Sequence, residues 1–127
     1  MAHWSHKHLG YLAGIGRFGV HHMLITPAGC TGRFGSLVTE AELENHPLIE
    51  TDETCLLKAG QECGKCIDAC PVHALKENGF DRRRCWDRLK ENRRSLSYFS
   101  DLPETTQVCA KCAAIMPCSF KNPVADL

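Results

Sequence analysis

The spacing of the cysteines constrains this chain more than any other feature of its sequence. Nine of its 127 residues are cysteine, and Cys63, Cys66 and Cys70 stand in the run C-x2-C-x3-C-P that ends at Pro71. That run matches the last three cysteines and the proline of C-x2-C-x2-C-x3-C-P, a pattern that binds iron–sulfur clusters in bacterial ferredoxins. The first cysteine of the pattern would fall at position 60, where the chain has Gly60. A ligand for that position therefore has to come from elsewhere in the chain.

A second cysteine motif, CAKCAAIMPC, lies near the end of the chain and repeats the C-x2-C spacing. By simple repetition a cysteine should stand before Pro117, but Met116 is there and Cys118 follows the proline instead. Each [4Fe–4S] cluster takes four ligands, and the cysteine before a proline usually reaches the other cluster of a pair. The spacing therefore predicts two interleaved sets, in which Cys55 replaces the ligand absent at position 60. The first set is Cys55, Cys63, Cys66 and Cys118, and the second is Cys70, Cys85, Cys109 and Cys112.

Other interpretations of the cysteines stay open at this point. A zinc-stabilised structural protein would hold its metal with the two C-x2-C pairs, Cys63 with Cys66 and Cys109 with Cys112. We favour clusters because zinc leaves the Cys-Pro step and four further cysteines unused. Cys30 belongs to neither set, and we interpret it as a small buried residue in a turn rather than as a redox thiol. It is also the alternative to Cys118 as the last ligand of the first cluster.

Composition and charge narrow the class of protein. Lys and Arg number 15, as do Asp and Glu, so the net charge gives no argument for nucleic acid or an anionic membrane. No apolar run is long enough for a signal peptide or a membrane span, which predicts a cytoplasmic protein. Disulfides are rare in the cytoplasm, and an odd number of cysteines fits their pairing poorly. Metal or cluster ligation is the better account of the cysteines.

Charges are nevertheless unevenly distributed along the chain. An acidic stretch runs from Glu40 to Glu53, and a basic one from Arg82 to Arg94. The basic stretch reads as a helix that could meet RNA phosphates or an acidic electron donor. The plainer interpretation is a solvated helix face with acidic neighbours.

The chain divides into two segments of different character. Residues 1–54 are rich in Gly and His and hold only Cys30, whereas residues 55–127 hold the other eight cysteines. We predict an α+β protein in which a small β-hairpin and helix segment precedes a mostly helical two-[4Fe–4S] ferredoxin-like module. Because the second segment has few long apolar runs, bound metal has to supply much of its folding free energy. We therefore expect residues 55–127 to be largely disordered without metal.

Local patterns predict five elements within these two segments. Gly-rich turns, β-branched runs and capping residues set their limits. The elements are a helix over residues 5–13, strands over residues 22–26 and 34–39 with a hairpin connection between them, a helix capped by Asp52 that runs to Gly60, and a longer helix over residues 81–94.

Two stretches of the sequence together resemble one protein family. AGIGRFGVHHMLITPAG followed by GRFGSLVTE is similar to the segment before the clusters in epoxyqueuosine reductase-like proteins, which are related to corrinoid reductive dehalogenases. CGKCIDACPVHAL, DRRRC and CAKC resemble the two-cluster segment of that family. There a lone cysteine, here Cys85, joins the cysteine before proline and the downstream C-x2-C pair. The resemblance covers nearly the whole chain and implies the same interleaved sets.

The resemblance implies a base-off cobalamin held over one cluster and reduction of a tRNA nucleoside epoxide or a carbon–halogen bond. Most of the family's nitroreductase-like cobalamin domain, including its proton-donating acid, has no counterpart here, so we predict a truncated or divergent member. Its expected function is to deliver electrons to a cobalamin-type reductase centre in a partner subunit or missing domain. The alternative is an enzyme, a reductase with its own cobalamin pocket formed by residues 1–54 in an oligomer. A tRNA partner has no support beyond the resemblance.

Glycines and histidines of the first segment are weaker candidates for a site. Gly14, Gly16 and Gly19 have the spacing G-x-G-x-x-G but follow no strand of a βαβ unit, which disfavours a dinucleotide site. By resemblance they belong to a loop on the cobalamin side. Imidazoles also bind metals, although a polar helix start explains most of these histidines more simply. The histidines concerned are His3, His6, His8, His21 and His22.

Overall fold

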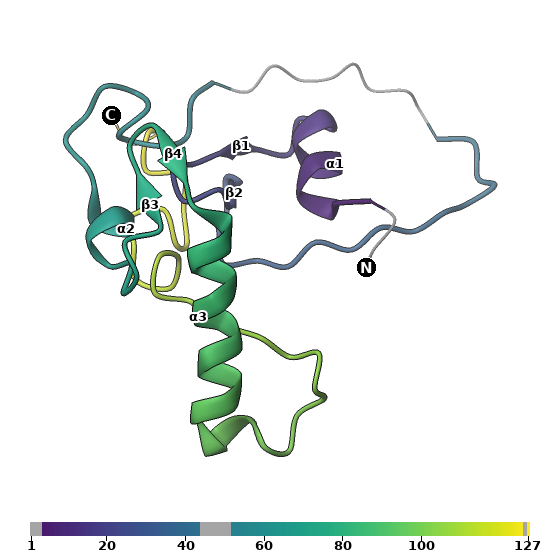
Figure 1. The fold of residues 1–127 in the computed structure, drawn as a ribbon. Coiled ribbons are helices and arrows are strands. Elements are labelled where there is room, and N and C mark those ends of the chain that lie inside the picture. The colour runs from purple at the N-terminus through teal and green to yellow at the C-terminus, as the bar shows by residue number, and fades with distance from the viewer. Residues whose placement is uncertain (1–3, 44–51, 126) are drawn as a thin grey trace.

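The computed structural model describes residues 4–43, 52–125 and 127. Within these residues it is a small α+β fold with three α-helices, one short 3-10 helix and two antiparallel sheets of two strands each (Figure 1). The predicted α+β class is confirmed. The second segment is not mostly helical, however, because α2 (Lys65–Asp68) and α3 (Arg82–Ser95) are the only α-helices in its described part. Loops that carry the cysteines make up most of the rest.

The first segment begins with α1 (His6–Leu12), which lies within the predicted helix. The chain then forms β1 (Arg17–Phe18) and β2 (Leu24–Ile25), which pair with Phe18 opposite Leu24. Gly16 is required just before β1, because a Cβ there would collide with the carbonyl of Ile25. This close approach buries Leu24 and Ile25 almost completely.

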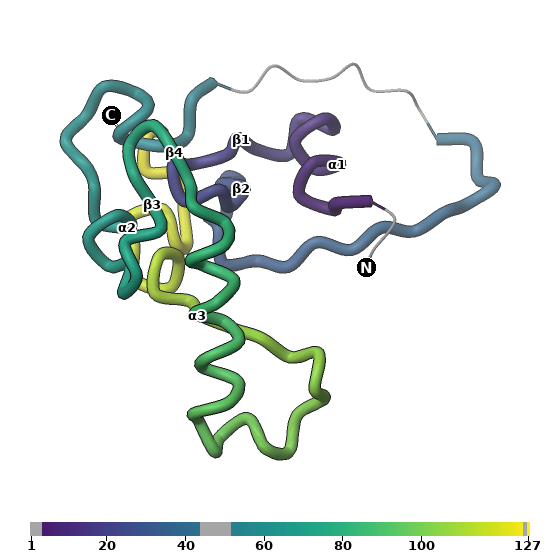
Figure 2. Tube along the Cα trace, viewed as in Figure 1, coloured from purple at the N-terminus to yellow at the C-terminus, as the bar shows by residue number. Residues whose placement is uncertain are grey.

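The strand predicted over residues 34–39 is wrong. β2 lies within the predicted strand 22–26 but pairs with β1 instead, and residues 34–39 have no regular secondary structure. Leu37 and Val38 are 88% and 86% exposed, and this part of the chain passes beside α1 as an extended loop (Figures 1 and 2), where Trp4 Nε1 donates to Ser36 Oγ at 3.2 Å. A tight turn closed by Thr26 and Gly29 also replaces the predicted hairpin connection. β-propensity without a pairing edge does not make a strand.

The helix predicted from Asp52 to Gly60 is reduced to turns. Backbone N–H groups of Ala59 and Gln61 donate to the carbonyls of Cys55 and Leu56, and Gly60 has a φ of +78°. The capping carboxylate is that of Glu53, not Asp52, because its Oε1 accepts from the backbone N–H of residues 54 and 55. The positive φ reverses the chain, so that it turns back toward the first C-x2-C pair.

A hairpin that the sequence patterns did not predict follows α2. Its strands are β3 (Leu75–Lys76) and β4 (Gly79–Phe80), with Leu75 opposite Phe80. The Glu77-Asn78-Gly79 stretch was the available signal, since Asn and Gly favour tight turns. The hairpin leads directly into α3, whose start it therefore positions.

Asp81 caps α3 by accepting a hydrogen bond from the backbone N–H of Arg84 at 3.0 Å, close to the predicted start of this helix. After α3 and the 3-10 helix η1 (Ser97–Phe99), the chain returns along the helix. The Asn92 amide holds the returning segment of the chain by donating to the carbonyl of Val108 at 2.9 Å. The Arg93 guanidinium donates to the carbonyls of Phe99 and Leu102. These contacts bring the second C-x2-C pair back toward α3.

The two segments share two small clusters of buried residues, in which cysteines pack with aliphatic side chains. One cluster of buried residues contains Val20, Cys66 and Leu75, and another contains Ile25 and Cys118. C-terminal loops lie beside β2 and α2 (Figure 2). Within the described residues no helix is long and apolar enough to cross a membrane.

Candidate metal centre

The first predicted cysteine set surrounds one cavity. Cys55, Cys63, Cys66 and Cys118 line one small cavity that is partly open to solvent, together with apolar residues such as Val20. Cys55 reaches it from the turn that Gly60 closes, and Cys66 from α2. The cysteine that the pattern lacks at position 60 is thus replaced, within this cavity, by a thiol from five residues earlier in the chain.

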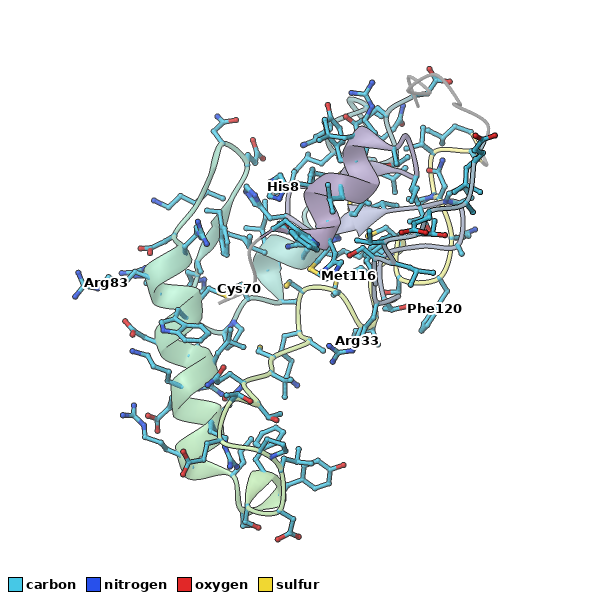
Figure 3. All side chains as sticks on the ribbon, turned by 90° about the vertical axis from the view of Figure 1, so that its right-hand side faces the viewer. His8, Arg33, Cys70, Arg83, Met116 and Phe120 are labelled. Carbon is cyan, nitrogen blue, oxygen red and sulfur yellow. The ribbon has the colours of Figure 1, made fainter. Side chains whose placement is uncertain are left out.

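The second predicted set surrounds a separate cavity. Cys70, Cys85, Cys109 and Cys112 line about 850 Å³ of empty space that is partly open to solvent. Cys70 follows α2, and Cys85 lies in the first turn of α3. Cys109 and Cys112 come from the irregular segment that returns along α3. The labelled side chains of Cys70 and Met116 lie in the middle of the molecule, between α3 and α1 (Figure 3). Each cavity therefore collects four thiols from distant parts of the sequence.

Interactions between the thiols follow the same grouping. The thiols that act most strongly on Cys66 are Cys55, Cys118 and Cys63. Those that act on Cys85 are Cys109 and Cys70. Cys112 of the second set also acts on Cys66, which is consistent with two neighbouring cavities.

Burial keeps several of these thiols protonated. It is the main cause that raises the pKa of Cys66 to about 11, followed by the neighbouring thiols. Burial also raises the pKa of Cys85 and of Cys112. The hydrogen bond with Cys30, and then burial, raise the pKa of Cys118. A metal that binds here has to displace these protons, so its apparent affinity rises with pH.

The loop that presents Cys118 is fixed by the first segment of the chain. Ser119, 1% exposed, accepts through its carbonyl from the backbone N–H of Cys30 at 3.1 Å and from the Thr31 hydroxyl at 2.9 Å. Its own hydroxyl accepts from the backbone N–H of Met116 at 2.7 Å. Gly29 is required opposite, because a Cβ there would collide with the Ser119 carbonyl. This packing explains how a cysteine displaced past Pro117 still faces the first cavity.

Two N–H groups point at sulfur atoms of the sets. The backbone N–H of Ala74 donates to Cys70 Sγ at 3.2 Å. His21, 5% exposed, has Nε2 3.3 Å from Cys118 Sγ, and its Nδ1 accepts from the backbone N–H of Met23 at 3.1 Å. Because Nδ1 is an acceptor, the ring proton is on Nε2, and His21 donates to the sulfur. Such donors tune iron–sulfur sites.

His21, Cys30 and Cys118 form the one group of potential metal ligands with clustered ligand atoms that is found among the described residues. The two sulfur atoms are 4.0 Å apart. Cys30 itself is buried in a turn, as predicted. Ligation by His21 Nε2 would require the proton to move to Nδ1, where it would face the N–H of Met23. The arrangement therefore suits His21 as a donor better than as a ligand.

Positive side chains surround the second cavity. Lys7, Arg88 and Lys111 line it. Lys7 Nζ donates to the carbonyl of His22 at 2.9 Å, which holds the ammonium in place without an acidic partner. Burial, and then the charge of Arg82, lower the pKa of Lys7. These cations offset the negative charge that four thiolates would bring.

The weaker candidates from the first segment have structural positions. Gly14 ends α1 with a φ of +69°, and Gly19 lies against the His21 ring, where a Cβ would come within 2.8 Å of Cε1. His6 and His8 lie on α1, while His3 lies outside the described residues. His21 and Ser119 support the first thiol site in ways that sequence patterns did not predict. Their partners lie far along the chain: His21 contacts Cys118, and the Ser119 carbonyl accepts hydrogen bonds from Cys30 and Thr31.

Comparisons with protein-family models, curated proteins and solved structures found no match to this chain. The family resemblance of the sequence therefore stays a prediction. The two cavities lined by cysteines are the basis for assigning a function to this chain.

Proposed function

We propose that this protein binds two [4Fe–4S] clusters and transfers electrons between a redox partner and an acceptor. The observation that supports this is the presence of two separate cavities, each lined by four cysteines. A zinc site would need only one such set. Two neighbouring sets of four thiols are the arrangement of two-cluster electron carriers.

The residues present fit this cofactor. All nine cysteines are free thiols, as cluster ligands must be, and the cavity walls are otherwise mainly apolar. A bound cluster would supply storage of one electron at a time, at a potential that hydrogen bonds and burial adjust. The chain provides the thiolates, lines the first cavity with apolar side chains such as Val20 and Met116, and donates N–H groups to Cys70 and Cys118.

The acceptor follows from the resemblance alone. We propose a cobalamin-type reductase centre in a partner subunit or domain, within the reducing environment of the cytoplasm, where free thiols persist. Titration of the metal-loaded chain with cobalamin tests whether the centre belongs to a partner. Stoichiometric binding by this chain would favour the alternative, in which it is itself a cobalamin-dependent reductase.

The decisive experiment is the iron, acid-labile sulfide and zinc content after anaerobic purification, with an EPR spectrum of the reduced protein. We expect about eight irons and eight sulfides per chain and signals from two interacting clusters. About four irons would mean that only one of the cavities binds a cluster. Zinc without sulfide would overturn the proposal.

One observation favours a second candidate, a zinc-stabilised structural protein. His21, Cys30 and Cys118 bring three ligand atoms within 4.8 Å of one another. A mononuclear zinc site would take these three with one further thiol. Zinc at one equivalent, lost in a His21→Gln variant, would support this candidate, whereas cluster binding tolerates that change.

A further inference from the structure

A groove lies along the outer side of α3, next to the second cavity. It holds about 680 Å³ of space open to solvent and is lined by Phe80, Arg82, Arg83, Cys85, Trp86 and Leu89. We call these residues the α3 groove. Trp86 is 48% exposed within it, and Arg82 and Arg83 are exposed. The labelled side chain of Arg83 extends outward from the start of the helix (Figure 3).

Cys85 connects this groove to the thiol site. Phe80, Cys85 and Leu89 line both the α3 groove and the second cavity, so they form the wall between them. A molecule seated in the groove would be separated from the second set of thiols by a single layer of side chains. The groove is therefore an exposed surface that lies directly against the second set of thiols.

The positive charge of the groove destabilises the start of α3. Arg82, Arg83 and Arg84 occupy the first turn of α3, where the positive end of the helix dipole disfavours cations. Arg84 has Asp81 3.8 Å away. Among the described residues, no carboxylate forms an ion pair with Arg82 or Arg83. Arg83 acts electrostatically on Asp87, one turn further along α3, without forming a direct ion pair. The side chains of Arg82 and Arg83 therefore stay available to a partner outside the fold.

Lys7 and Lys58 extend the positive region on the side of the hairpin. Their ammonium groups donate to backbone carbonyls, those of His22 and Phe18 respectively, so their charges are held in place without being neutralised. Both lie close enough to His22 to lower its pKa, after the larger effect of burial. His22 in turn stacks on Phe80 of the groove, with ring centroids 4.9 Å apart.

We propose that the α3 groove is the docking surface for an acidic electron-carrier protein, which exchanges electrons with the second thiol site at Cys85. This inference rests on the proposed function. The exchange moves one electron from the reduced carrier to the oxidised chain, and no bond is made or broken. Exposed arginines provide steering, and the exposed Trp86 with the half-buried Phe80 provides an apolar centre for a small, transient interface.

A carrier protein suits this surface better than a nucleic acid does. The chain as a whole has a net charge of zero, so it offers no extended field for a phosphate backbone. Further along α3 the basic residues Lys90 and Arg94 pair with acids of the same helix, so the basic residues without an ion pair that line the groove are at the start of the helix. A partner bound beside the wall of the thiol site would be close enough to exchange electrons with it, whereas binding of phosphates does not require that location.

The test measures binding, so that it does not depend on reduction potentials. The cluster-loaded chain is titrated by calorimetry with an oxidised plant-type ferredoxin, an acidic one-electron carrier. The variant Arg82→Gln/Arg83→Gln removes two charges from the groove. Lys90→Gln/Arg94→Gln removes two charges further along the same helix, where each side chain pairs with an acid at i−3. Iron content and melting temperature confirm that both variants are loaded and folded.

At about 0.01 M ionic strength, where the Debye length is about 30 Å, we expect the groove variant to bind roughly tenfold more weakly than the unchanged chain. The matched variant should change affinity less than about twofold. At about 1 M the difference should disappear because charges are then screened over about 3 Å.

Three results would overturn the inference while leaving the proposed function intact. Equal affinity of the groove variant and the unchanged chain would exclude docking at this surface. An equal loss in both variants would mean nonspecific attraction by charge. Binding of a tRNA-sized transcript that is lost in the groove variant, with ferredoxin binding unchanged, would assign the arginines to RNA. Absence of iron and sulfide, by contrast, would remove the proposed function itself.

Discussion

Cys30 and Cys118 have their sulfur atoms 4.0 Å apart, yet only Cys118 lines the first four-cysteine cavity. We therefore predict different effects of replacing each with serine. Cys118→Ser should lose about four of eight irons, because a cube missing one of its four ligands is poorly held. Cys30→Ser should keep all of them. Iron and sulfide analysis after anaerobic purification checks this, and a Cys30→Ser variant that alone loses four irons would reverse the assignment.

His21 should tune the first cluster rather than hold it. Its Nε2–H donates to Cys118 Sγ, and such a bond stabilises the more negative, reduced state. We predict that His21→Phe lowers the reduction potential by on the order of 50 mV, since about 1 kcal/mol of differential hydrogen bonding is lost. His21→Gln keeps donor groups and should lie closer to the unchanged chain.

Redox titration followed by EPR measures that potential. His8→Phe is the matched control, because His8 is an exposed imidazole of α1 that contacts Ser5 rather than a thiol. Loss of iron from the His21→Phe variant would identify His21 as a ligand and contradict its role as a donor.

The spacing of the cysteines predicted how they group, but it did not predict the residues that position them. The four-and-four grouping follows from the cysteine motifs, because ligand number and motif geometry are fixed by the cofactor. The donation by His21 is not readable from the sequence, since it joins residues 97 positions apart. The Ser119 contacts depend in the same way on a turn whose partner lies in the other segment.

Among the elements, α3 carries the most local information and was predicted most closely. Its observed range, Arg82–Ser95, is shifted by one residue from the predicted 81–94, because Asp81 is the residue that caps the helix rather than its first residue. The strand over 34–39 failed because pairing is a property of two segments, and β2 found a nearer partner in β1. Short strands of two residues leave little periodicity to detect.

The Asp81 cap should matter for the second thiol site as well as for the helix. Asp81→Ala removes the acceptor for the Arg84 N–H and should destabilise the protein by about 1 kcal/mol. Because Cys85 lies in the same turn, we also expect iron of the second cluster to be released faster to a chelator. Asp81→Ser should largely preserve both properties, and Asp87→Ala, an exposed acid of the same helix, serves as the control. Thermal melts and chelation kinetics make the comparison.

The turn at residues 27–31 should be equally sensitive at one glycine. Gly29 has a φ of +91° and faces the Ser119 carbonyl. We expect Gly29→Ala to cost about 1 kcal/mol or more and to displace the loop that presents Cys118, with loss of about four irons. Gly32→Ala is the matched control, since a Cβ there meets nothing within 4 Å. Similar iron contents of the two variants would show that this packing does not position Cys118.

At the scale of the whole molecule, sulfur takes the place that aliphatic side chains have in larger cores. Cys66, Cys70 and Cys118 belong to the buried core, whereas many large apolar side chains are exposed, Leu37 and Ile115 among them. The short sheets and α2 cannot supply enough buried apolar area for a chain of this size. We therefore predict that ligation of the thiols contributes much of the free energy of folding.

Removal of the metal tests this directly. Anaerobic treatment with a chelator and an iron oxidant should abolish the cooperative thermal transition and collapse the amide dispersion of residues 55–127 in an NMR spectrum, because buried protonated thiols replace bonds that link four distant chain segments. Reconstitution with iron and sulfide should restore both signals, which separates reversible unfolding from damage. A metal-free chain with well-dispersed amide resonances would show instead that the small apolar core is sufficient to stabilise the fold. Ligation by the cysteines would then not be required for folding.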